Sequence, residues 1–422
     1  MKPGAPSLLL VIGALDATER GDQPLAVRRS SRALALDSNN LHVQAIARQA
    51  SGVKEPSLEG RFCRAPFQNI ETAPDGGVYF CCPAWLPVPI GRLSGEGGSD
   101  AVWNSAAAQE IRRSVHDGDY RYCSRTHCPH LSLDTLPVPD EVKNAELRGM
   151  AANRTTTIGR GPKKIVLSHD RSCNLSCPSC RTMTILARKD EQKRLNQVAD
   201  DVILPMLRDA DRVHVTGSGD PFGSAHFRYV LKRVTRDGFP KLRLDIQTNG
   251  VLFDEAAWID LDLDGRIDKV AISMDAATEP TYVITRRGGD FARLMDNLAF
   301  LGGKRAAGDL KTIRLDFVVQ AINFREMPAM VAIAGQFGFD GIKFQMIRNW
   351  NTYSPAEFAA NNIGSREHPD YAAFLEVLRQ DVLQAPTIEF WGMANALTDA
   401  RRTAPSEPAD GARQLAAAWP VA

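Results

Sequence analysis

Three closely spaced cysteines constrain this chain more than any other feature of its sequence. Cys173, Cys177 and Cys180 follow the apolar run 164–167 with the spacing CxxxCxxC. Such a trio of thiolates can bind three irons of one [4Fe–4S] cube, because soft sulfur ligands suit iron–sulfur clusters. The fourth iron then receives no ligand from this loop and is open to an exogenous molecule. A structural zinc site is the alternative, but zinc takes four ligands there, and this loop offers three with no histidine.

Length, charge and cysteine usage set wider bounds. The 422 residues are enough for two or three domains with sizeable cores. The 51 Lys and Arg nearly balance the 50 Asp and Glu, which gives no electrostatic case for nucleic acid or an anionic membrane as partner. The 8 cysteines are clustered, which indicates metal ligands in a reducing compartment, so we expect a cytoplasmic protein. No apolar run approaches membrane-spanning length.

The N-terminus contains a short apolar run that could be read as a signal peptide. The run 7–15 follows a thin positive region, and Asp16 comes directly after it. Both features argue against export.

The composition changes along the chain and predicts four parts. Residues 1–60 read as two helices around a polar turn, which cannot bury an apolar face alone and must dock on something. Residues 61–150 hold five of the cysteines among many Gly and Pro, and such a segment needs a metal to hold it together. Residues 151–390 alternate strand and helix patterns. Residues 391–422 are rich in Ala and Pro without periodicity, so we expect a flexible tail.

The alternating section predicts the fold. Six apolar or alternating runs are each followed by a turn and a helical pattern, as at 227–236 and 291–301. The runs are 164–169, 212–216, 243–247, 269–274, 314–319 and 341–346. Such β-α units in series predict an α/β fold with a parallel sheet and right-handed crossovers, either open or curled into a partial barrel. In either form, chemistry collects at the carboxyl ends of the strands.

Polar residues follow these strands at that end. The glycines after the second strand let the backbone approach a ligand, and Asp220 can accept hydrogen bonds from an ammonium group. Ser273 and Asp275 share one strand face and could hold a ribose. Each motif alone could be a plain turn, but together they outline a pocket for a small polar ligand. The candidates are Gly217, Ser218, Gly219, Asp220, Asn249, Ser273, Asp275 and Asn323.

These motifs together resemble the radical S-adenosylmethionine (SAM) enzymes over roughly 165–350. The resemblance rests on the cysteine spacing, the glycine-rich turn, Thr-Asn-Gly at 248–250, and the runs 272–275 and 286–291. It implies a partial (β/α)6 barrel and a [4Fe–4S] cluster whose open iron chelates the amino and carboxylate groups of SAM. It also implies reductive cleavage of SAM to a 5′-deoxyadenosyl radical that abstracts a substrate hydrogen.

The same resemblance implies roles for single residues. Cys173, Cys177 and Cys180 would ligate the cluster. The turn 217–220 would meet the methionine amine, and Ser273 with Asp275 would face the ribose. The residue before the last motif cysteine is commonly aromatic and packs near the adenine. It is a serine in this chain, so the adenine contact must come from elsewhere.

The upstream cysteines resemble the SPASM/twitch auxiliary-cluster module, which usually follows the barrel and here precedes it. The resemblance implies an auxiliary [4Fe–4S] cluster on Cys63, Cys81, Cys123 and Cys128, and the alignment of 78–81 selects Cys81 rather than Cys82. A zinc site with the same four ligands is the alternative. Cys82 is then a spare thiol, and we favour an inert role for it over hydrogen-atom donation to a substrate radical.

The resemblance implies oxidative modification of a ribosomally made peptide, by cross-linking or dehydrogenation. Radical epimerisation, dehydration or dehydrogenation of a sugar, nucleotide or other small metabolite is the alternative. A catalytically silent electron carrier is a third reading, which the ligand residues at the strand ends oppose. The expected partners are the peptide or small-molecule substrate and an external electron donor such as flavodoxin or ferredoxin.

Overall fold

The structure is a computed structural model that describes residues 22–36, 58–93, 98–125, 127–132, 134–215 and 218–402. The chain divides into two compact units. The first unit comprises the residues up to 176 together with 183–272 and 292–313. The second unit comprises 177–182, 273–291 and the residues from 314 onward.

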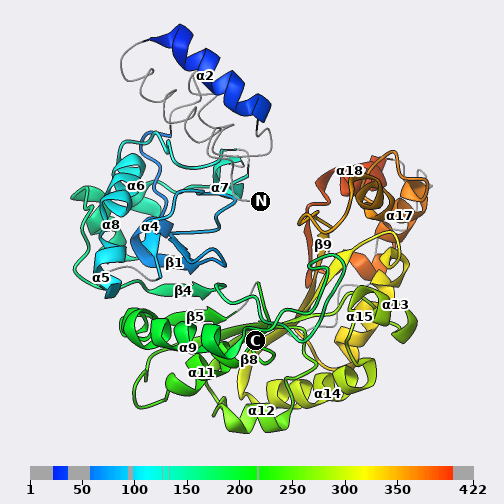
Figure 1. Cartoon of the computed structure of the whole chain (residues 1–422). Coiled ribbons are helices and arrows are strands. Elements are labelled where there is room, and N and C mark those ends of the chain that lie inside the picture. Colours follow the sequence, from blue (N-terminus) through cyan, green and yellow to red (C-terminus); the bar gives the residue numbers. More distant parts are fainter. Residues whose placement is uncertain are drawn as a thin grey trace. The chain divides into compact units, whose positions relative to one another are not determined.

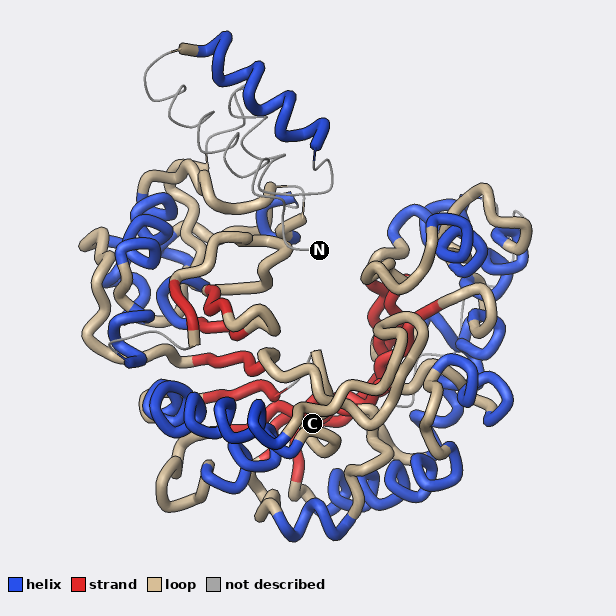
Figure 2. The backbone as a smooth tube through the Cα atoms, in the orientation of Figure 1, coloured by secondary structure: helices blue, strands red, loops and turns tan. Residues whose placement is uncertain are grey.

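The first unit is built on a sheet whose central strands are parallel. Strands β4 (Lys164–Leu167), β5 (Arg212–Val215), β6 (Arg243–Thr248) and β7 (Ile267–Ser273) pair in chain order. Strand β1 (Asn69–Thr72) pairs parallel with β4, and β2 (Gly77–Tyr79) and β3 (Gly91–Arg92) follow antiparallel. Figure 2 shows these strands in red. The cysteine-rich segment and the first half of the barrel therefore share one sheet.

Helices cover this sheet, and several begin at a side-chain cap. Ser105, Asn144, Ser224 and Asp254 each accept a backbone N–H in the first turn of the helix that they precede. Helices α9 and α11 run next to each other (Figure 1). The helices are α2 (Gln23–Leu36), α4 (Ala65–Gln68), α5 (Gly98–Trp103), α6 (Ala106–His116), α7 (Pro129–Ser132), η1 (Pro139–Glu141), α8 (Ala145–Ala152), α9 (Lys189–Val198), η2 (Ala199–Ile203), α10 (Leu204–Leu207), α11 (Ala225–Arg233), α12 (Glu255–Asp260) and α14 (Phe291–Ala307).

The second unit contains the remaining strands. The later part of β8 (Leu310–Val319), β9 (Gly341–Met346) and β10 (Ile388–Trp391) form parallel pairs in chain order. The helices of this unit are α13 (Glu279–Thr285), η3 (Phe324–Glu326), α15 (Met327–Gln336), α16 (Pro355–Asn361), α17 (Tyr371–Leu378), η4 (Asp381–Gln384) and α18 (Ala394–Arg402).

The predicted α/β class with the parallel β-α units of a partial (β/α)6 barrel is confirmed. All six predicted strands are present as β4 to β9. The four predicted parts stay a prediction, with one correction. The flexible tail from residue 391 is wrong for 394–402, because α18 buries Ala396 and Ala400 and its Asp399 pairs with Arg366. The predicted second N-terminal helix, the turn before it and residues 403–422 lie outside the described residues.

Among the helices that the structure describes, none is both long and apolar enough to cross a membrane.

A buried polar chain fastens the cysteine-rich segment to the barrel beside the β1–β4 pair. The hydroxyl of Thr72 in β1 lies 2.9 Å from Nδ1 of His169, which follows β4. Nε2 of His169 lies 2.8 Å from Nε2 of His226 in α11, and Nδ1 of that ring lies 3.0 Å from Oδ1 of Asn196 in α9. The Asn196 amide oxygen can only accept, so Nδ1 of His226 carries the hydrogen there. With both rings neutral, His169 then donates to His226, and the Thr72 hydroxyl donates to His169. Burial lowers the pKa of His226 to about 4 and that of His169 well below its usual range.

We expect this pair to make stability depend on pH. Below pH 6.5 the unfolded His226 binds a proton, whereas the folded ring stays neutral down to about pH 4. The unfolded state then binds more protons, so the free energy of unfolding falls as the pH drops through that window. Urea titrations at pH 7, 6, 5 and 4 should show a steeper fall for the wild type than for His226→Gln. If the free energy of unfolding falls equally with pH in both proteins, His226 is not the origin of the pH dependence.

Candidate functional site

Cys173, the first cysteine of the CxxxCxxC loop, belongs to the first unit. One hydrogen bond fixes its backbone, and two N–H groups contact its sulfur. The backbone N–H of Cys173 donates to the carbonyl of Ile185 at 2.8 Å, which forms an isolated antiparallel bridge. Its Sγ accepts from the backbone N–H of Leu175 at 3.4 Å and from Nδ2 of Asn249 at 3.8 Å. The thiol is buried. N–H groups aimed at sulfur suit a thiolate that carries negative charge.

The turn after β5 lies against the backbone that leads into this loop. A Cβ added at Gly219 would collide with the carbonyl oxygen of Ser172 and would lie 2.6 Å from that of Asp170. A side chain is therefore excluded at this position. The backbone N–H of the next residue, Asp220, donates to the same Ser172 carbonyl at 2.8 Å.

The carboxylate of Asp220 joins the ends of two strands. Its Oδ1 accepts the backbone N–H groups of Phe222 and Gly223, both at 3.0 Å. Its Oδ2 accepts the Thr248 hydroxyl and the Asn249 backbone N–H, both at 2.7 Å. A carboxylate has about four acceptor positions, and these four donors fill them. Asp220 is 1% exposed, so this geometry favours a positioning role over the predicted contact with a methionine ammonium group.

The other two motif cysteines belong to the second unit. The backbone N–H groups of Cys180 and Arg181 both donate to the Cys177 carbonyl at 2.9 Å, which closes a tight turn. The guanidinium of Arg286 lies 3.7 Å from the Cys177 sulfur, and that of Arg181 lies 3.5 Å from the Cys180 sulfur. Burial raises the pKa of the Cys177 thiol, and the Arg286 charge opposes that rise. A cationic group therefore accompanies each of these two sulfurs.

Asp275 pairs with Arg286 instead of standing free. Its Oδ2 lies 3.0 Å from Nε of Arg286, and its Oδ1 accepts the backbone N–H of Val318 at 2.8 Å. The 3.0 Å pair is not aligned as a hydrogen bond, so both of its atoms lack a partner of good geometry. Burial raises the pKa of Asp275, and Arg286 opposes the rise.

Several buried polar atoms of the second unit have no hydrogen-bond partner among the described residues. Buried groups of this kind are rare in native proteins and are typical of ligand sites. They are Asp275 Oδ2, Tyr282 Oη, Arg286 Nε, Gln320 Nε2 and Thr352 Oγ1. The donors and acceptors in this set could each satisfy a polar ligand.

The remaining predicted ligand residues differ in where the structure places them. Asn323 is fully buried, donates to the carbonyls of Asp275 and Val318, and accepts the Gln320 backbone N–H, so it braces the strand end. Ser273 ends β7, and its side chain is half-buried. Gly217 lies outside the described residues. The predicted ligand roles of all these positions stay predictions.

In the cysteine-rich segment, three stretches of chain bring four sulfurs into one region. Burial raises the pKa of Cys63 to about 11 and those of Cys81 and Cys123 well above their usual range. For Cys81, the charges of Cys63, Cys123 and Cys128 add to this rise, so its thiol lies near all three. A positive metal would reverse this repulsion and favour the thiolates.

The backbone near these cysteines is cross-linked by hydrogen bonds. The hydroxyl of Tyr120 accepts the Cys63 backbone N–H at 3.1 Å, while the Tyr120 carbonyl accepts that of Cys123 at 2.8 Å. The Ser124 backbone N–H donates to the Trp85 carbonyl at 2.7 Å, which ties the third stretch to the second. Tyr120 is buried and adopts a positive φ of 49°, a conformation that packing must enforce.

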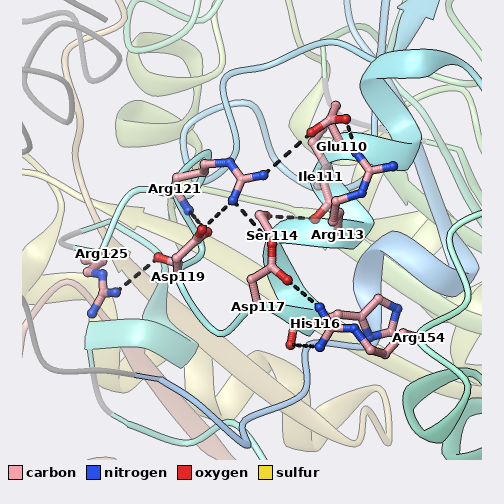
Figure 3. Close-up of polar contacts among 10 residues, drawn as sticks. All are labelled: Glu110, Ile111, Arg113, Ser114, His116, Asp117, Asp119, Arg121, Arg125 and Arg154. Carbon is pink, nitrogen blue, oxygen red and sulfur yellow. Dashed lines mark hydrogen bonds and ion pairs between the residues drawn. The ribbon is translucent and has the colours of Figure 1, made fainter. Parts of the chain in front are cut away.

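Charged side chains hold the loop that leads to Cys123 on the end of α6. Figure 3 shows Arg121 directed at Asp117 and Asp119, and Arg154 directed at Asp117 from the end of α8. The Arg154 guanidinium also donates to the carbonyl of His116 at 2.9 Å. A single exposed ion pair stabilises a protein little. Several ion pairs that share residues, as here, fix the geometry of the loop before Cys123 better than one pair would.

Within the described part of the chain, no group of three or more His, Cys, Asp and Glu side chains is placed to hold a metal ion.

Comparison with known proteins agrees with both sites. Residues 167–304 match the radical SAM superfamily, and residues 63–129 match SPASM, an iron–sulfur cluster-binding domain. The chain therefore contains a segment that matches radical SAM enzymes, and a SPASM domain precedes that segment in the sequence. These domains imply SAM with a [4Fe–4S] cluster for the first and an auxiliary iron–sulfur cluster for the second.

The fold is also similar to solved structures. Streptococcus suis SuiB bound to precursor peptide SuiA is 14% identical, with a TM-score of 0.39, and the match covers 71% of this chain and 66% of that chain. Native anSMEcpe with bound AdoMet and Cp18Cys peptide is 17% identical, with a TM-score of 0.36 and coverage of 54% and 63%. TYW1 with a lysine-pyruvate adduct is 13% identical, with a TM-score of 0.33 and coverage of 53% and 72%.

The match spans slightly less than two thirds of the SuiB chain. No curated protein matches the chain.

We expect Gly219→Ala to damage the cysteine loop. Its Cβ would collide with backbone carbonyls that cannot move without shifting the residues before Cys173. The substitution should cost about 1–3 kcal/mol of stability through overpacking and should lower iron content. Gly303→Ala in α14 is the matched control, because nothing lies within 4 Å of its added Cβ. That change should be neutral or stabilising by up to about 1 kcal/mol. Thermal unfolding and iron analysis compare the two variants. Equal stability of both would contradict the close approach of Gly219 to the backbone before Cys173.

Proposed function

We propose that this protein is a radical SAM enzyme that oxidatively modifies a ribosomally made peptide, either by dehydrogenation or by forming a carbon–carbon or carbon–heteroatom cross-link. The observation that carries this proposal is the pairing of β1 with β4. This pairing attaches the segment with four thiols directly to the strand that leads into the CxxxCxxC loop. The peptide as substrate class rests on the SPASM domain, which the family resemblance associates with peptide maturation.

The residues present fit the implied cofactors. Cys173, Cys177 and Cys180 would hold the SAM-binding cluster, and each sulfur already has an N–H donor beside it. Cys63, Cys81, Cys123 and Cys128 would hold the auxiliary cluster. When bound and reduced, the first cluster supplies the electron that cleaves SAM to methionine and a 5′-deoxyadenosyl radical.

The polar side chains of the second unit are suited to orient a small polar molecule such as SAM. Tyr282 Oη and Gln320 Nε2 are buried without partners, and each such group costs about 1–3 kcal/mol until it is satisfied. Arg286 carries a permanent positive charge that can pair with a carboxylate. The carboxylate of Asp275 lies 3.0 Å from Nε of Arg286 and holds the guanidinium in place. These residues would bind and orient, and their burial would exclude water from the reacting atoms.

A net oxidation needs a second acceptor after hydrogen abstraction. Removing one hydrogen atom leaves a substrate radical, and a double bond or cross-link then requires loss of one more electron and one proton. The thiols of the SPASM domain are the residues that can hold the group that receives that electron. A flavodoxin or ferredoxin would supply the electron that starts the cycle.

The test is formation of 5′-deoxyadenosine by anaerobically reconstituted protein with SAM and dithionite. Cys177→Ala should reduce this product at least a hundredfold, because one cluster ligand is missing. Liquid chromatography with mass spectrometry measures the product. If the wild type forms no more 5′-deoxyadenosine than Cys177→Ala, the proposal that this protein is an enzyme is wrong. With active protein, a candidate precursor peptide should lose two hydrogen atoms, whereas conversion of a small metabolite alone would redirect the substrate class.

We expect the two adjacent cysteines to differ. Cys81→Ala should remove the auxiliary cluster and about half of the bound iron, because its thiol lies among the other three. Cys82→Ala is the matched control and should retain the full iron content. Iron and sulfide analysis with Mössbauer spectroscopy distinguishes them. Loss of the auxiliary cluster in Cys82→Ala alone would transfer the ligand role to that residue.

A further inference from the structure

The side chain of Asn249 points at a cluster sulfur rather than at an open ligand site. Its Nδ2 lies 3.8 Å from Sγ of Cys173 and 2.9 Å from Oδ1 of Asn174. Both amide hydrogens are used in this way. Its Oδ1 accepts the backbone N–H of Val251 at 3.1 Å. The residue is 5% exposed.

These contacts fix which end of the amide faces the sulfur. An inverted amide would place its oxygen against Asn174 Oδ1 and its NH2 group against the Val251 N–H. Both contacts would then be repulsive, so the network assigns the donor to Cys173. The orientation does not depend on the sulfur itself.

The backbone of Asn249 is anchored separately. Its N–H donates to Oδ2 of Asp220, whose carboxylate also holds the Thr248 hydroxyl and the turn after β5. The backbone N–H of Asp220 in turn donates to the Ser172 carbonyl, one residue before the ligand. The donor is therefore held by the carboxylate of Asp220 and the cysteine loop by the backbone N–H of the same residue, which limits how far the donor and the sulfur can separate.

A hydrogen bond to a ligand sulfur stabilises the reduced cluster more than the oxidised one, because reduction adds negative charge. We propose that Asn249 is a positioning residue that raises the reduction potential of the SAM-binding [4Fe–4S] cluster through its N–H···S contact with Cys173. Asp220 holds it in place for this purpose. This inference rests on the proposed function, since it requires the cluster on Cys173.

The experiment is a redox titration of the full reconstituted chain, monitored by electron paramagnetic resonance without SAM. The SAM-binding cluster is identified as the signal that changes when SAM is added afterwards, and the auxiliary cluster serves as internal reference. At the potential where the wild-type SAM-binding cluster is half reduced, Asn249→Ala should show about a fivefold lower ratio of reduced to oxidised cluster, the effect of one ordinary hydrogen bond. The auxiliary cluster should not shift.

Asn297→Ala is the matched control. Asn297 is buried in α14 and donates to the carbonyls of Gly250 and Val251 at 2.8 and 3.0 Å, so it braces the same turn without touching sulfur. A midpoint shift of equal size in this variant would assign the effect to turn geometry and overturn the proposal.

Two further variants keep the proposal decidable. Asn249→Asp retains the shape but replaces the donor with a negative oxygen, so its midpoint should fall below that of Asn249→Ala. Asn249→Gln retains an amide on a longer side chain, so its midpoint should lie between those of the wild type and Asn249→Ala. Loss of the cluster from all three Asn249 variants, with Asn297→Ala intact, would show a purely structural role and overturn the tuning.

Two outcomes separate this proposal from others. An unchanged midpoint with a higher SAM requirement would mean that Asn249 binds SAM, which also overturns it. If instead the wild type shows no SAM-responsive signal, the proposed function itself fails.

Discussion

One buried carboxylate determines the geometry of the first unit's active end. Asp220 accepts four hydrogen bonds, two from its own turn and two from the turn after β6, while its backbone N–H reaches the residue before Cys173. Three strand ends thus meet at one residue that is almost completely buried, two of them at its carboxylate and the third at its backbone N–H. Charge-assisted hydrogen bonds of this kind are about twice as strong as neutral ones. The positions of the first ligand sulfur and of Asn249 follow from it.

The alternation of apolar strands and helical runs was enough to predict β4 to β9 and the parallel α/β class. Buried and partly exposed residues alternate along strands such as β5 and β9, and the apolar residues take the buried positions, so the period of two is visible in the sequence. Strand β10 was not predicted, because Ile388–Trp391 alternates partly exposed residues and lies beyond the last β-α repeat. Helix α18 was missed because its buried face consists of alanines, which carry little hydrophobic signal.

The polar residues that follow the strands in the sequence predicted which residue types gather at the strand ends, but not what they contact. Asp220 and Asn323 were predicted as ligand residues. The Asp220 carboxylate is instead occupied by three backbone N–H groups and the Thr248 hydroxyl, and the Asn323 amide by backbone groups. A local pattern shows that a carboxylate or amide follows a strand. It does not show which distant N–H groups will fill its acceptors, because those depend on tertiary packing. The contacts of Arg286 with Cys177 and of Tyr120 with Cys63 likewise have no local signature.

The β1–β4 pair has a consequence for how this protein could be dissected. Because β1 pairs with one edge of β4, a fragment that begins after residue 152 would leave the N–H and C=O groups along that edge of β4 unpaired. Uncovered edges of that kind recruit other strands and promote self-association. The isolated barrel would therefore be prone to aggregate and would not serve as a minimal enzyme. Because the cysteine-rich segment comes first in the chain, it is synthesised before the barrel, and β1 is available to pair with β4 as soon as β4 forms.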